Sequence, residues 1–184
     1  MALVHPLLKK PSLDKADLKN YRPISNLTFI SKVTEKAVSL QLTTYLESNN
    51  ILPTRQSAYR RNHSTETALL RVYSDLTSAV DRGETILLGL LDLSSAFDTA
   101  VYGILLLRLE KSHGLCGGVL GWLRSYLSDR MQTVILEDGT KSAPHHLGTG
   151  VPQGSVLGPL LFLLYTTDVP DIISSRPPLT YLCR

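Results

Sequence analysis

Residues 86–95 read Ile86-Leu87-Leu88-Gly89-Leu90-Leu91-Asp92-Leu93-Ser94-Ser95 and form an apolar run with one carboxylate near its end. The run is short and Gly83 and Glu84 precede it, which predicts a strand buried on both faces rather than a helix. An ionised carboxylate at the end of such a strand is costly unless positive charge offsets it. Asp92 is therefore the candidate to bind a metal ion or strong hydrogen-bond donors. The alternative is that Asp92 caps the helix that follows.

The rest of the chain alternates helical and extended patterns without internal repeats, which predicts an α/β fold. Apolar residues recur at helical spacing in several segments, and the stripe from Leu69 to Ala79 is predicted to face the core. Asp138 and Gly139, a pair favoured in tight turns, predict a β-hairpin. The predicted helices cover about residues 31–46, 64–79, 104–109, 119–127 and 157–167, and the hairpin strands cover 131–137 and 141–147.

Length and composition fit one domain with a substantial core, because the chain has 184 residues and is 43% hydrophobic. Cys116 and Cys183 match no metal-binding or redox spacing, which suggests a reducing compartment. The chain opens without the long apolar segment of a secretory signal, so we expect an intracellular protein, nuclear or cytoplasmic, that is not secreted. The apolar stretch from Val156 to Tyr165 is too short to span a bilayer, so no membrane partner is expected.

Charge is distributed unevenly along the sequence. Residues 1–61 contain ten Lys and Arg against four Asp and Glu, a balance of +6, whereas residues 62–184 contain nine against twelve, a balance of −3. A basic part beside an acidic part suits a polyanion that one part holds and the other processes. Ordinary surface chemistry is the alternative interpretation.

The loop between Gly150 and Gly158 combines glycines and a proline with the amide of Gln153. Glycines let the backbone approach a ligand closely, and Gln153 offers both a donor and an acceptor, so a sugar or a base could be recognised here. The alternative is a plain connection between the hairpin and the last helix.

Five segments, taken in order, match the motifs of one known family. They are residues 20–25 (NYRPIS), 56–66 (QSAYRRNHSTE), 91–99 (LDLSSAFDT), 122–130 (WLRSYLSDR) and 150–159 (GVPQGSVLGP). In content and order they resemble the reverse transcriptase domain of non-LTR (LINE-type) retrotransposons along nearly the whole chain. The first two resemble fingers motifs, and the third resembles the palm motif that carries the first metal-binding aspartate.

This resemblance implies the fingers, at about residues 1–80, and part of the palm, at about 81–184, of a right-hand polymerase, with antiparallel palm strands packed on helices. It implies an RNA-directed DNA polymerase, whose intact form adds deoxynucleoside triphosphates to a DNA primer on an RNA template. Two Mg²⁺ ions would activate the primer hydroxyl and offset charge on the transferred phosphoryl group.

The palm motif carries two implied roles. Asp92 matches the first metal ligand, and Phe97 matches the position that packs under the incoming sugar and excludes a 2′-hydroxyl by its bulk. The alternative for Phe97 is a core aromatic. Asp98 lies within the motif without an implied metal contact.

The fingers and the loop carry the other implied roles. Arg22 matches the arginine that clamps the triphosphate with its planar fork, and Lys9 or Lys10 would add positive charge nearby. The alternative for Arg22 is a surface ion pair. Gln153 and Gly154 match the loop that contacts the incoming nucleotide.

The sequence also departs from the family pattern. That pattern continues to a hairpin tip with adjacent aspartates, and the 184 residues contain no Asp-Asp pair. Metal sites lose function when ligands are missing, so we expect a truncated domain without polymerase activity on its own. Smaller departures are Val101-Tyr102, where the family has an acidic residue and a histidine, and Asn62-His63, where it has a more basic pair. Two further interpretations are a nucleic-acid-binding remnant and a phosphotransferase with Asp92 as nucleophile, against which Ser94 counts.

Overall fold

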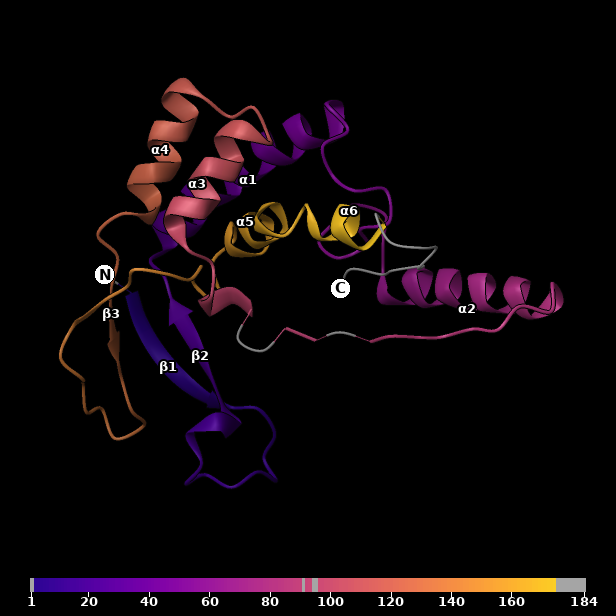
Figure 1. Cartoon of the computed structure of the whole chain (residues 1–184). Coiled ribbons are helices and arrows are strands. Elements are labelled where there is room, and N and C mark those ends of the chain that lie inside the picture. The colour runs from indigo at the N-terminus through magenta and orange to yellow at the C-terminus, as the bar shows by residue number, and fades with distance from the viewer. Residues whose placement is uncertain (1, 91, 94–95, 175–184) are drawn as a thin grey trace. The chain divides into compact units, whose positions relative to one another are not determined.

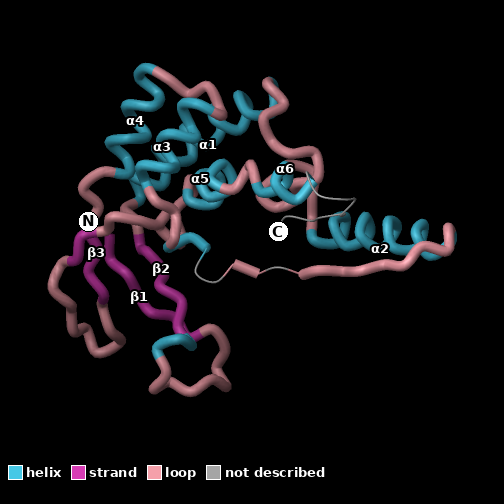
Figure 2. Tube along the Cα trace, viewed as in Figure 1, coloured by secondary structure: helices cyan, strands magenta, loops and turns pink. Residues whose placement is uncertain are grey.

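The computed structural model describes residues 2–90, 92–93 and 96–174. The chain divides into two units: unit 1 comprises Met1–Tyr45 and Ser95–Tyr165, and unit 2 comprises Leu46–Ser94 and Thr166–Arg184. Figure 1 labels the helices and strands along the chain. Figure 2 shows helices together with one small sheet. The prediction of a mixed α and β fold is therefore confirmed.

The sheet of unit 1 joins segments that are far apart in the sequence. Its strands are β1 (Ala2–Leu8), β2 (Tyr21–Asn26), β3 (Met131–Val134) and β4 (His145–His146), in the spatial order β2-β1-β3-β4. β1 pairs antiparallel with β2, so that Leu7 lies opposite Arg22 and Val4 lies opposite Ser25. β1 pairs parallel with β3, and β3 pairs antiparallel with β4. The sheet is therefore mixed.

β2 forms one edge of this sheet, and its sequence suits that position. Pro23 lies opposite Pro6 of β1. A proline has no N–H to donate, so a strand tolerates it where the donor would point away from the partner. Hydrogen bonding alternates along an antiparallel pair, so the N–H of Ser25, two residues after Pro23, also points away from β1. The outer edge of β2 therefore presents a backbone donor that needs an acceptor.

The helices of unit 1 pack through leucines. After the short η1 (Leu18–Asn20), they are α1 (Phe29–Ser48), η2 (Ala96–Asp98), α3 (Tyr102–Lys111), α4 (Gly117–Leu127) and α5 (Gly158–Tyr165). α3 contacts both α4 and α5. The buried side chains of these three helices, each at most 1% exposed, include Leu105, Leu109, Leu123, Leu127, Leu161 and Leu164. The apolar core of unit 1 lies among them.

Unit 2 contains α2 (Thr65–Asp81) and α6 (Val169–Ser174). A capping box begins α2: the Ser64 hydroxyl accepts from the N–H of Thr67 at 3.2 Å, and the Thr67 hydroxyl accepts from the N–H of Ser64 at 2.9 Å. The predicted start of this helix near Ser64 is confirmed. Its predicted core stripe is not continuous, because Leu69 is 59% exposed.

The predicted buried strand at residues 86–95 is wrong for the residues that the structure describes. Residues 84–90 and 92–93 form an exposed loop, in which Leu87 and Leu90 are each 86% exposed. Leu91, Ser94 and Ser95 lie outside the described residues. A strand needs a neighbour to accept its backbone hydrogen bonds. Within the described ranges the sheet consists of β1 to β4, and none of them pairs with this run. An apolar composition predicts burial, but it does not supply a partner strand.

Most other local patterns are confirmed. The helices predicted at about residues 31–46, 104–109, 119–127 and 157–167 correspond to α1, α3, α4 and α5. The hairpin around Asp138-Gly139 is confirmed by the pairing of β3 with β4 and by a further bridge between Ile135 and Lys141. The sequence patterns did not indicate β1, β2 and α6. Over the part of the chain that the structure covers, no helix has the length and apolar character required to cross a membrane.

The leucine core makes a direct prediction. Replacing Leu109 with alanine is expected to lower the free energy of unfolding by about 2–5 kcal/mol, because the side chain is fully buried and leaves a cavity. Leu107 lies on the same helix and is 56% exposed, so L107A is expected to cost less than about 1 kcal/mol. Urea unfolding followed by circular dichroism measures both. Equal losses in the two variants would contradict the leucine core.

Candidate functional site

The loop from Gly150 to Gly158 is closed on itself by hydrogen bonds. The Ser155 hydroxyl donates to the carbonyl oxygen of Pro152 at 2.8 Å and accepts from the N–H of Gly158 at 2.9 Å. The N–H of Ser155 also donates to the carbonyl of Pro152, at 3.1 Å. Val151, Pro152 and Leu157 are buried. The loop is thus a packed turn that leads into α5.

The middle of this loop lies against the outer edge of β2. The carbonyl oxygen of Gln153 accepts the outward-pointing N–H of Ser25 at 2.8 Å. Gly154 follows with φ +99°, and a Cβ on it would lie 3.0 Å from the carbonyl oxygen of Ser25. Only glycine adopts this backbone conformation and this approach without strain. Gln153 and Gly154, predicted from sequence as one element of the site, are therefore seated on the strand that carries Arg22.

The start of the loop lies against η2. The N–H of Val151 donates to the carbonyl of Phe97 at 2.7 Å, and the N–H of Gly150 donates to the carbonyl of Ala100 at 2.8 Å. The ring of Phe97 is half-buried and packs against the ring of Phe162, with 5.2 Å between centroids. Within unit 1 the structure thus brings the Phe97 turn, the Gln153 loop and the β2 strand together.

The end of the loop is held by Glu35 of α1, a residue that the sequence reasoning missed. One carboxylate oxygen of Glu35 accepts from the N–H of Val156 at 2.7 Å and of Leu157 at 3.3 Å, and the other accepts from the Ser31 hydroxyl at 3.2 Å. Glu35 is 1% exposed. The sequence offered one signal for Glu35, because it is a single glutamate on the inner face of a helical pattern. Glutamates are almost never fully buried unless they are paired, so a glutamate in that position needs a partner.

Tyr126 of α4 lies in the same buried region. Burial first, and the nearby charge of Glu35 second, raise the pKa of the Tyr126 phenol to about 12. The ring stacks on Trp122 at 5.4 Å between centroids, and the guanidinium of Arg130 lies 4.8 Å over it. The motif at residues 122–130 thus places a partly buried aromatic ring near Glu35, which holds the end of the loop.

The candidate triphosphate ligands lie on the hairpin formed by β1 and β2. Arg22 is exposed opposite Leu7, on the same face of β2 as Ile24, whose Cγ2 would lie 3.8 Å from a Cβ on Gly154. Lys10 is exposed just beyond the end of β1. Lys9 instead donates from its ammonium to the carbonyl of Lys19 at 2.7 Å. Arg22 and Lys10 are therefore two exposed cations of this hairpin that are available to a ligand.

Asp92 is exposed and belongs to unit 2, whereas Arg22, Phe97 and Gln153 belong to unit 1. The expectation that burial obliges Asp92 to find a positive partner is wrong, because its charge faces water. Asp98 of unit 1 is partly desolvated, which raises the pKa of its carboxyl. Among the residues that the structure describes, no group of three or more His, Cys, Asp or Glu side chains is placed to hold a metal ion.

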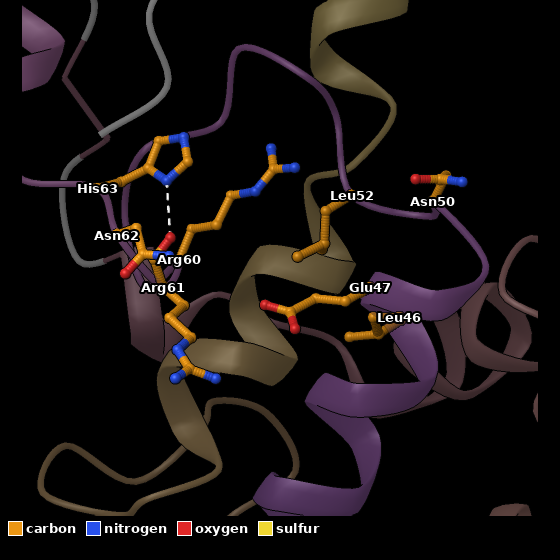
Figure 3. A pocket seen from close by; sticks show the side chains of 8 residues that line it. All are labelled: Leu46, Glu47, Asn50, Leu52, Arg60, Arg61, Asn62 and His63. Carbon is orange, nitrogen blue, oxygen red and sulfur yellow. Dashed lines mark hydrogen bonds between the residues drawn. The ribbon is translucent and has the colours of Figure 1, made fainter.

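Unit 2 contains a groove of about 430 Å³ at the end of α1 (Figure 3). The groove is lined by Leu46, Glu47, Asn50, Leu52, Arg60, Arg61, Asn62 and His63. Arg60 is tied to the loop by donating to the carbonyl of Pro53 at 3.0 Å, and the ring of His63 contacts the carbonyl of Arg61 at 2.9 Å. Arg61 is exposed. Two arginines against one glutamate give the groove a net positive charge.

Comparison with known proteins decides the family. The sequence model described as "Reverse transcriptase (RNA-dependent DNA polymerase)" matches residues 8–183. The chain belongs to the reverse transcriptase family. The match includes all five motifs and both units, and the resemblance to LINE-type retrotransposons is confirmed by the relatives that follow.

The reverse transcriptase relatives are proteins of Drosophila mobile elements. The chain is 36% identical over 165 residues to "Probable RNA-directed DNA polymerase from transposon X-element" and 34% identical over 164 residues to "Probable RNA-directed DNA polymerase from transposon BS", both of Drosophila melanogaster. It is 30% identical over 165 residues to "RNA-directed DNA polymerase from mobile element jockey" of Drosophila funebris. These alignments cover 89–90% of the chain and 18% of each relative. The chain therefore spans about a fifth of the length of these relatives.

The contact between the loop and β2 can be tested at Gly154. G154A is expected to lower the free energy of unfolding by about 1–3 kcal/mol, because alanine is strained at a positive φ. Its methyl group would also press on the carbonyl of Ser25. Gly148 has ordinary φ and open space at its Cβ, so G148A is expected to be neutral or slightly stabilising. Thermal melts of the two variants provide the comparison, and an unchanged G154A would contradict this geometry.

Proposed function

We propose that the chain is the nucleotide- and template-binding part of the RNA-directed DNA polymerase of a LINE-type retroelement. About residues 1–80 would form the fingers and about 81–184 part of the palm. The observation that supports this most is the meeting of three reverse transcriptase motifs at the Gly150–Gly158 loop of unit 1. Motifs that are distant in sequence would share a contact point if they served one ligand.

The ligand proposed for this point is an incoming deoxynucleoside triphosphate. Arg22 would hold the phosphates with its planar guanidinium, and Lys10 would add a point charge. Among the described residues neither side chain forms an ion pair, so neither would have to give up a carboxylate to bind phosphate. Gln153 would contact the nucleotide from the loop, where Gly154 allows close approach of the backbone.

Phe97 is proposed to contact the sugar of that nucleotide. Its ring is braced on one side by Phe162 and is only half-buried. A braced ring cannot turn aside to admit a 2′-hydroxyl, which is what exclusion of ribonucleotides by bulk requires. Contact with the sugar is compatible with the packing role of Phe97, because the same ring can pack against Phe162 on one side and face the sugar on the other.

Reverse transcriptases generally use a divalent metal ion, and Asp92 is the carboxylate of this chain that we propose as a Mg²⁺ ligand. The described side chains as a set do not fit a two-metal site, since three or more acidic or imidazole groups do not gather at one point among them. We therefore propose that these 184 residues by themselves bind a nucleotide without joining it to a DNA primer.

An RNA template is the partner proposed for the groove of unit 2. Arg61 is exposed at its rim and Arg60 lines its wall, in the part of the sequence that carries the basic excess. Arginines recognise phosphodiesters through paired N–H groups, and Asn62 and His63 add further donors. Positive charge near open solvent favours a phosphate backbone over a neutral ligand.

The nucleotide site can be tested by binding. R22A is expected to weaken the affinity for a deoxynucleoside triphosphate with Mg²⁺ about tenfold or more, because a charge-assisted contact to phosphate is lost. R124A removes an exposed arginine of α4 and is expected to bind as the unaltered chain does. Isothermal titration or a fluorescent nucleotide measures both. Equal affinities for R22A and R124A would refute the assignment. The unaltered chain is expected to incorporate no nucleotide in primer extension on an RNA template.

The groove can be tested through the salt dependence of RNA binding. The affinity for single-stranded RNA is expected to fall steeply with salt, because phosphate contacts release counterions. R61A removes one phosphate contact, so it should make the slope of log affinity against log salt shallower by about 1. The matched control is R71A, an exposed arginine on α2 of the same unit. A slope that R61A and R71A leave unchanged would remove the groove from the proposal.

A further inference from the structure

Glu35 is a carboxylate buried in the interior of unit 1, and its contacts are unusual for such a group. Its hydrogen-bond donors are the backbone N–H groups of Val156 and Leu157 and the hydroxyl of Ser31. A buried carboxylate usually pairs with a cation. Here two of three donors belong to one loop, 121 and 122 residues further along the chain.

We propose that Glu35 is a positioning residue for nucleotide binding: its carboxylate fixes the end of the Gly150–Gly158 loop and thereby keeps Gln153 against β2. The inference rests on the proposed function, in which Gln153 contacts the incoming nucleotide. Glu35 itself is only 1% exposed, so it would act through the loop and not by direct contact with the nucleotide.

The spacing along the loop supports this role. Gln153 is held through its carbonyl by Ser25, and Val156 is held through its N–H by Glu35. Only Gly154 and Ser155 lie between these two anchors. With both ends fixed, the short segment between them has few backbone conformations left. If Glu35 released Val156, Gln153 would keep its bond to Ser25, but the segment that follows Gln153 would lose its hydrogen bonds to α1.

A purely structural role makes a different prediction. If the carboxylate of Glu35 did not hold the loop, its neutral isostere would leave the amides of Val156 and Leu157 as protected as before, and removing the buried charge would also remove its desolvation cost. A loop clamp loses strength on the same replacement, since backbone N–H groups bind a charged acceptor more strongly than a neutral one.

The first experiment measures amide hydrogen exchange at Val156 and Leu157 in the unaltered chain and in E35Q. Exchange at these amides is expected to be about ten- to a hundredfold faster in E35Q, as the loss of charge-assisted bonds requires. Two variants provide the controls. S31A removes the third donor to Glu35 without touching the loop, and E110Q makes the same chemical change on the exposed surface of α3; neither should change exchange at the two amides.

E35D keeps the charge on a side chain one methylene shorter and is expected to give intermediate exchange. It also serves as the test variant if E35Q does not fold. Exchange at Val156 and Leu157 no faster than in the unaltered chain, in whichever of these variants folds, would overturn the clamp.

The second experiment connects the clamp to binding. E35Q and Q153A are each expected to weaken nucleotide binding about tenfold, and the double variant E35Q/Q153A should be no weaker than Q153A alone, because Glu35 acts through Gln153. If the affinity loss of E35Q/Q153A equals the loss of E35Q multiplied by the loss of Q153A, Glu35 does not act through Gln153 and the positioning role is overturned. If Q153A alone binds as the unaltered chain does, the proposed function fails at that residue, whereas the exchange result still reports separately on the clamp.

Discussion

The N–H of Ser25 on the outer edge of β2 needs an acceptor, and the carbonyl of Gln153 supplies it at 2.8 Å. Much of unit 1 depends on this one bond. Through this bond the loop that precedes α5 lies against the edge of the sheet, and the start of the same loop is bonded to Phe97 and Ala100. Gly154 permits the approach and Glu35 secures the end of the loop from α1. An edge strand left open would also invite pairing with other chains, so the same contact protects the sheet and builds the candidate site.

The sequence predicted those elements whose signals are local. Apolar patterns identified α1, α3, α4 and α5 and placed the start of α2 near Ser64, and the Asp138-Gly139 turn identified the hairpin. The run at residues 86–95 failed because a strand is defined by its partner, and partners are chosen by the whole fold. For the same reason β1 and β2 went unnoticed: β1 carries a proline and takes its second neighbour, β3, from more than a hundred residues away.

The residues of the candidate site also divide into those with a local sequence signal and those without one. Gln153, Gly154 and Phe97 could be named from motifs. The structure places them around one loop, because the carbonyl of Gln153 accepts from Ser25 and the carbonyl of Phe97 accepts from Val151. Glu35 could not be named, because its importance comes from burial and from donors in a distant loop, neither of which a helix pattern reveals. Asp92 shows the opposite error. It was singled out by a cost of burial that does not exist for an exposed side chain, so its proposed metal role now depends on the family motif alone.

Family membership does not depend on the failed strand. The five motifs carry the family because their residues and order match, whereas the strand prediction relied on composition. What changes is where the structural support for function lies. A carboxylate at a strand end would have placed the chemistry in the run at residues 86–95. The observed contacts point instead to the loop of unit 1, which is held by backbone hydrogen bonds and by the buried carboxylate of Glu35. Binding can be supported by such a site without a complete set of metal ligands, and this is why nucleotide recognition and nucleotide joining are separated in the proposal for this chain.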